Sequence, residues 1–196
     1  MSYSDFTLKS IQAEFGTIAR TERLFADAVP ATPPEWLVDL LARTMQIPLI
    51  SEKARSELIV MPVLLACRTL TNDKIAIFSG SRMDVDPDRG LYGECDFILS
   101  RTPSAPELRA PLIAIVEAKK NDVEAGMGQC IAQMIGARQF NDEAGMPICP
   151  IYGCITTGEV WQFLKLEGAT ASIDTRRYYL DSLPEILGVF LHIINS

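Results

Sequence analysis

The chain has 196 residues, of which 48% are hydrophobic and 22% are charged, and its formal net charge at pH 7 is −7. This length and apolar content favour one globular domain with a sizeable core and exclude a disordered chain. The acidic balance counts against a protein that coats nucleic acid with a broad basic surface. It is compatible with an enzyme whose acidic metal site is flanked by a local basic rim.

The sequence contains no pattern typical of export or of membrane insertion. Its longest apolar runs, such as "ILGVFLHII" at 186–194, are too short to span a bilayer. The first ten residues lack a basic stretch followed by an apolar one. The five cysteines are odd in number and match no zinc spacing. We therefore expect a cytoplasmic protein with reduced, mostly buried thiols and no membrane partner.

The first third of the chain has helical spacing. The pattern is loose over 5–25 and clearly amphipathic over 33–46, where proline stands at the start. A further helix is expected over 51–70, with Ser51 as its N-cap. Pro62 lies inside that segment and predicts a kink or a boundary, because proline removes one backbone hydrogen bond.

The rest of the chain predicts strands and two more helices. Helical spacing returns over 121–145, with Gly145 as the stop, and again from about Leu183. Strands are expected over 73–81, 93–101, 111–119, 149–158, 159–168 and, in a shorter form, near 171–179. The order α-β-β-β-α-β-β-β-α predicts a mixed sheet flanked by helices.

Catalysis that depends on histidine is disfavoured, because the only histidine, His192, lies in the apolar C-terminal run. That position is typical of a core or helix-end residue. Ser-His-Asp sites, Cys-His sites and multi-histidine metal sites are therefore improbable. Acid–base or metal chemistry in this chain must depend on carboxylates and lysine.

An apolar strand, "PLIAIVEAK", ends by presenting Glu117 and Lys119. Residues two apart on a strand point to the same face, although a lone Glu-x-Lys is commonly a solvated ion pair. If the preceding strand forms an antiparallel hairpin with this one, paired residue numbers sum to roughly 213 and Asp96 lies opposite Glu117. Facing carboxylates repel unless a cation lies between them, and Mg²⁺ prefers such oxygens. The Lys119 ammonium could then stabilise charge on a phosphate or orient an attacking water.

Asp96, followed by Glu117-Ala118-Lys119 after an apolar strand, resembles the PD-(D/E)xK nuclease superfamily. The likeness covers about 51–165. It implies a restriction-endonuclease-like α/β (α+β) fold, with a mixed central sheet and an αβββαβ core flanked by helices. The expected single domain, 1–196, would carry a helical extension at 1–50 and a C-terminal strand and helix at 166–196.

The resemblance also implies site roles. Asp96 and Glu117 would bind Mg²⁺, for which Mn²⁺ could substitute, and Glu57 would be a further ligand. Lys119 would assist the attacking water. Gln129, on the following helix, would position Lys119 or the substrate, with Gln133 one turn on. The sequence departs from the family pattern at Cys95, where the motif's name has proline. The stretch "VEAKKND…GQCIAQM" also resembles small bacterial restriction-like domains.

Each of these residues has a plainer interpretation. Glu57 could be a surface residue, Asp96 a turn-side carboxylate, and Gln129 with Gln133 the polar edge of a helix. Their order along the expected elements is what favours a site. The basic residues expected to contact DNA phosphates, by their position near that site, are Arg82, Arg89, Arg101, Lys120 and Arg138.

We therefore expect a Mg²⁺-dependent nuclease that hydrolyses phosphodiester bonds, with DNA as substrate and a homodimer as a possible assembly. The alternative is a non-catalytic module of the same fold, acting as a binding domain or subunit in a defence or repair complex. A small-molecule enzyme has no motif in its favour.

Overall fold

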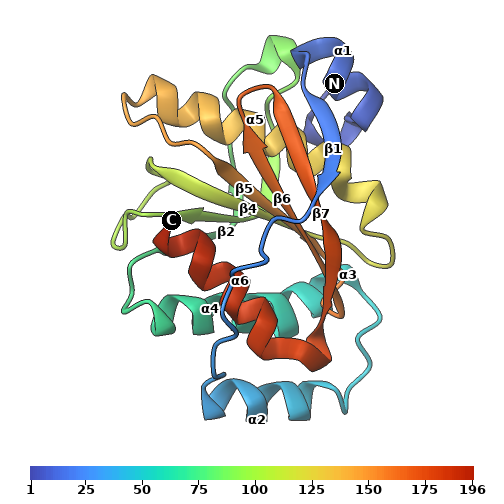
Figure 1. Ribbon diagram of the computed structural model, residues 1–196, viewed down its shortest axis with the longest axis vertical. Coiled ribbons are helices and arrows are strands. Elements are labelled where there is room, and N and C mark those ends of the chain that lie inside the picture. Colours follow the sequence, from blue (N-terminus) through green and yellow to red (C-terminus); the bar gives the residue numbers. More distant parts are fainter.

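The computed structural model describes residues 1–196 and contains one seven-stranded mixed sheet (Figure 1). The strand order is β1-β7-β6-β5-β4-β3-β2. The β1–β7 and β4–β5 pairs are parallel and the other neighbours are antiparallel. The predicted mixed sheet flanked by helices is therefore confirmed. The strands are β1 (Ile18–Glu22), β2 (Ala76–Arg82), β3 (Glu94–Ser100), β4 (Leu112–Ala118), β5 (Ile151–Thr156), β6 (Val160–Glu167) and β7 (Thr170–Tyr179).

Helices cover both faces of this sheet. Helix α5 lies with α1 on one side, whereas α4 and α6 lie on the other, with α2 outside them (Figure 1). None of the helices combines the length and the apolar character needed to cross a bilayer. The helices are α1 (Leu8–Phe15), α2 (Glu35–Thr44), α3 (Glu52–Arg55), α4 (Met61–Leu70), α5 (Met127–Glu143) and α6 (Leu183–Asn195).

Strand β4, an interior strand of the sheet, is buried along its whole length. Ile115 packs into the core under α5, and Val116 packs into the core shared by α4 and α6. A strand covered on both faces needs apolar residues at every position, which explains the unbroken apolar run before Glu117. The glutamate that ends this strand is therefore carried into a buried environment. All five cysteines are free, and of these only Cys149 is exposed.

The N-terminal segment differs from the prediction in one respect. Helix α1 occupies part of the predicted helical stretch, but residues 18–22 form β1, which pairs in parallel with β7 at the edge of the sheet. Four of its five residues are charged or small, and none is buried, so this edge strand lacks the apolar alternation by which a half-buried strand is predicted. The extension before residue 50 is thus not wholly helical. Strand β7, expected to be short, has ten residues.

Pro62 produces the predicted boundary within residues 51–70. A π-helical turn, Ser56–Val60, separates α3 from α4, and the Met61 N–H bonds the Ser56 carbonyl five residues back. Pro62 has no N–H to offer the Leu58 carbonyl, which instead accepts a long hydrogen bond from the buried Thr44 hydroxyl at 3.5 Å. Glu57 lies within this turn.

Candidate active site

The β3–β4 hairpin has the predicted register, because Phe97 pairs with Val116 and Ile98 with Ile115. One step further along, Asp96 reaches the end of β4. Its Oδ2 accepts a hydrogen bond from the Ala118 N–H at 2.7 Å. The two strands therefore bring Asp96 beside the Glu117-Ala118 segment.

Glu117 is almost fully buried and accepts hydrogen bonds on both carboxylate oxygens. Its Oε1 accepts from the Lys119 ammonium at 2.8 Å and from the Gln129 amide. Its Oε2 accepts from the Gln133 amide at 3.0 Å. Lys119 also donates to Gln129 Oε1 at 3.0 Å, so Glu117, Lys119 and Gln129 form a closed ring of contacts. The structure thus joins the end of β4 to the first turns of α5.

The electrostatics of this cluster follow from its burial. Burial raises the pKa of Glu117 from 4.5 to about 7, and the nearby charge of Asp96 adds to the shift. Burial also raises the pKa of Asp96, although its bond from the Ala118 N–H acts in the opposite direction. Burial lowers the pKa of Lys119, but the Glu117 carboxylate outweighs this and the net shift is upward. Lys119 therefore stays protonated at neutral pH.

An acidic cavity of about 340 Å³ opens beside Asp96. Glu57 lies at its wall with its side chain 62% exposed, 3.8 Å from the Lys53 ammonium. Two further acids line this cavity, Glu52 from α3 and Glu94 from β3. Sequence reasoning missed both, although Glu94 stands two residues before Asp96 on the same strand, and that spacing is the signal that could have found it.

The hairpin end, meaning the open end of the β3–β4 hairpin where Asp96 and Glu117 lie, carries oxygen atoms of the kind that a hard divalent cation prefers as ligands. Asp96 Oδ1 has no hydrogen-bond partner within the chain, and Gln133 Oε1 is fully buried without one. No three His, Cys, Asp or Glu side chains are grouped closely enough to enclose an ion. Mg²⁺ needs only one or two carboxylates because it retains several waters. Asp96 meets that requirement, whereas Glu117 is already held by internal donors.

Two of the basic residues expected to contact phosphate lie next to the hairpin end. Arg82 is opposite Glu94 in the β2–β3 ladder. Lys120 directly follows Lys119 and lines a depression of about 250 Å³. Arg55 and Arg177 line the same depression and were not foreseen, because they come from α3 and β7. Lys120 has no ion-pair partner within 4 Å, so its charge remains available.

The other three basic residues are not gathered at the hairpin end. Arg101 directly follows β3 and lies five residues from Asp96, roughly 16 Å away at the usual strand rise. Arg138 lies nine residues along α5 from Gln129, about 13 Å away at the helical rise. Arg89 is paired at 3.0 Å with a glutamate of α1 and stacks over an aromatic ring there. These three residues therefore lie outside the cluster that Asp96, Glu117, Lys119 and Gln129 form, and their expected contact with phosphate stays a prediction.

No protein-family model matches this chain, and a search of curated proteins finds no match either. The likeness to PD-(D/E)xK nucleases is therefore carried only by the residues described above.

Proposed function

We propose that this chain is a divalent-metal-dependent nuclease that cleaves DNA in the cytoplasm. One observation carries the proposal: Asp96, Glu117, Lys119 and Gln129 come from three elements and meet at the hairpin end beside an acidic cavity. The free thiols agree with a reducing compartment.

Asp96, Lys119 and Gln129 each have a separate role in the proposed reaction. Asp96 is fixed by the Ala118 N–H, which leaves Oδ1 free as a metal ligand. A bound Mg²⁺ would supply Lewis-acid stabilisation and a more acidic water. Lys119 keeps its proton because its pKa is raised, so it acts as a fixed cation toward the phosphate and not as a base. Gln129 holds the ammonium in place through its amide oxygen.

The competing function is a non-catalytic module of the same architecture. It is favoured by the internal hydrogen bonds on both oxygens of Glu117, which is only 2% exposed. In this case the Glu117–Lys119 pair orders the junction of β4 and α5 without contacting substrate.

An enzyme that cuts both strands of a duplex would also need two sites, which a homodimer would provide.

The first test is cleavage of plasmid and linear DNA with Mg²⁺ or Mn²⁺. We expect cleavage by the wild type and a loss of at least about 100-fold in Asp96→Asn and Lys119→Met. Glu107→Gln, which changes an exposed loop carboxylate, is the control and should cut normally. Equal cleavage by all four proteins would dismiss the assignment.

The second test separates the two functions without relying on turnover. A metal that binds only the folded state, at 100 times its Kd, stabilises by about 2.7 kcal/mol, which corresponds to roughly 5–10 °C in Tm for a chain of this size. We expect this rise for the wild type and none for Asp96→Asn. A Tm that is indifferent to Mg²⁺ and Mn²⁺ favours the non-catalytic module.

A further inference from the structure

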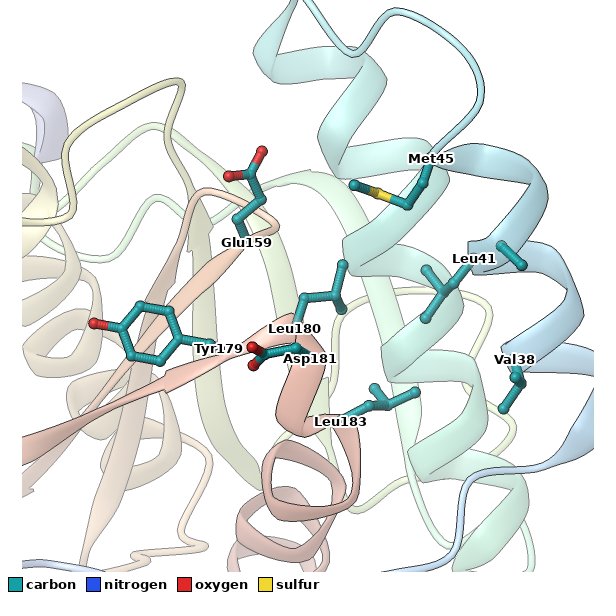
Figure 2. A pocket seen from close by; sticks show the side chains of 9 residues that line it. Val38, Leu41, Met45, Glu159, Tyr179, Leu180, Asp181 and Leu183 are labelled. Atoms are coloured by element: carbon teal, nitrogen blue, oxygen red, sulfur yellow. The ribbon is translucent and has the colours of Figure 1, made fainter.

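An open apolar groove lies between α2 and the segment that joins β7 to α6 (Figure 2). Its volume is about 510 Å³. Helix α2 contributes one wall, and Leu180 and Leu183 contribute part of the other. The α2 wall consists of Val38, Leu41 and Ala42, together with Met45, which is the C-cap of this helix.

The α2 wall has the spacing i, i+3, i+4, i+7, which is the stripe that a helix presents to a packing neighbour. Here the stripe is only half covered. Val38 is 49% exposed and Met45 is 54% exposed, whereas Leu41 is buried at the floor. Tyr179 lines the opposite side and is 51% exposed. Small ligands are usually enclosed over most of their surface, so a groove this open is better matched to a macromolecular partner.

The charges beside the groove are acidic. Glu159 and Asp181 line it, and no lysine or arginine does. Glu159 has a partial counter-ion in Arg55 at 3.5 Å, whereas Asp181 has no ion-pair partner. Figure 2 places the Glu159 carboxylate on the side of the groove facing Met45. A second copy of this chain would bring the same carboxylates toward each other in a two-fold interface, on a chain whose net charge is already −7. The groove therefore favours a basic partner over self-association.

We propose that this groove docks a basic amphipathic helix of a partner protein. Apolar side chains of that helix would fill the space beside Ala42 and Leu180, and its lysines or arginines would pair with Glu159 and Asp181. Such docking covers the unpartnered stripe of α2 and neutralises the acidic edge. None of Asp96, Glu117, Lys119 and Gln129 lines the groove, although Glu159 also borders the depression beside Lys120. The inference does not depend on nuclease activity.

The test uses a fluorescein-labelled helical peptide of leucine and lysine, with leucine at i, i+3, i+4 and i+7, titrated with the full chain by fluorescence anisotropy. A scrambled peptide of the same composition is the peptide control. We expect saturable micromolar binding of the first peptide only. Ala42→Arg, at an exposed position in the groove, fills the apolar space and repels the lysines of the peptide, so it should weaken binding at least tenfold. Gln12→Arg adds the same charge at an exposed position on α1 and should weaken binding much less.

A second variant tests the electrostatic part. Glu159→Gln combined with Asp181→Asn should weaken binding severalfold and flatten its salt dependence. Absence of saturable binding, equal binding of the scrambled peptide, or an unchanged affinity in Ala42→Arg each overturns the proposal. A wild-type dimer that Ala42→Arg converts to monomer, measured by sedimentation, would assign the groove to a second copy instead.

Discussion

Lys119→Met should destabilise the metal-free chain more at pH 8 than at pH 5. The ammonium of Lys119 is 2.8 Å from Glu117 Oε1, inside a cluster where Glu117 is 2% exposed. Because the pKa of Glu117 is raised to about 7, this carboxyl is mostly protonated in the folded chain at pH 5 and mostly ionised at pH 8. Its ion pair with Lys119 is therefore fully formed only at the higher pH.

The expected magnitude follows from linkage. At pH 5 the substitution removes hydrogen bonds to a neutral carboxyl, at a cost of about 1 kcal/mol. At pH 8, ionisation of Glu117 one pH unit above its folded-state pKa lowers the free energy of the folded wild type by about 1.4 kcal/mol relative to its neutral form. The unfolded chain gains more, because Glu117 ionises near 4.5 there, so the wild type loses net stability between pH 5 and pH 8. That unfolded-state contribution is the same in the variant and cancels in the comparison. In the variant, Glu117 loses its cation, its pKa rises further, and the folded-state gain disappears. The cost of the substitution should thus grow to about 2–3 kcal/mol at pH 8.

The assay is urea unfolding at pH 5, 6, 7 and 8 in EDTA. Lys165→Met is the matched control, because Lys165 pairs at 3.3 Å with Glu167, whose side chain is 60% exposed. Exposed pairs contribute little, so its cost should stay below about 1 kcal/mol at every pH. A Lys119→Met cost that is the same at pH 5 and pH 8 would refute the argument, since Glu117 would then not ionise within this range.

Three other substitutions test the packing around the site. Asn141→Leu should cost about 2–5 kcal/mol in urea unfolding, because the buried amide of Asn141 bonds both the N–H and the carbonyl of the first β4 residue, at 2.7 and 2.8 Å. Gly128→Ala should lower the free energy of unfolding by about 1–3 kcal/mol, since its Cβ would lie 2.2 Å from the Phe6 carbonyl oxygen; an unchanged Tm would show that the N-terminal segment yields. At pH 8, the double substitution Glu117→Met with Lys119→Met should be no less stable than Lys119→Met alone, because removing both charges avoids an unpaired buried one; a clearly additive loss would contradict this.

The parts of the fold that could be predicted depend on short-range patterns. Strand alternation and the length of the intervening loop were enough to predict the β3–β4 register, and with it the approach of Asp96 to the Glu117 segment. The same alternation put Lys119 on the side of Glu117. The resemblance to PD-(D/E)xK nucleases indicated Gln129, with Gln133 one turn on, and both side chains of α5 reach this end of the sheet.

The parts that could not be predicted depend on distant pairing. Nothing near β1 indicates that Ile18 pairs with Thr170, because that contact joins residues far apart in the chain. Likewise Glu52 of α3 lines the same cavity as Asp96 of β3, two residues far apart in the chain. The burial of Glu117 also depends on the docking of α5, so its three hydrogen bonds were outside what spacing can indicate.

The state of Glu117 in the free chain does not by itself decide between the two functions. A carboxylate has about four acceptor positions, and three of those on Glu117 are used by Lys119, Gln129 and Gln133. One position on Oε2 therefore remains, close to the unpaired oxygen of Gln133. If a cation binds there, the pKa of Glu117 must fall, since an opposite charge favours its ionised form. In EDTA the stability of the wild type falls between pH 5 and pH 7, because Glu117 ionises near 4.5 in the unfolded chain and only near 7 in the folded one. In saturating Mg²⁺ bound at Glu117 this fall would disappear, because the carboxyl would be ionised in both states over this range. If the cation binds only at Asp96, the fall persists, because burial still raises the pKa of Glu117.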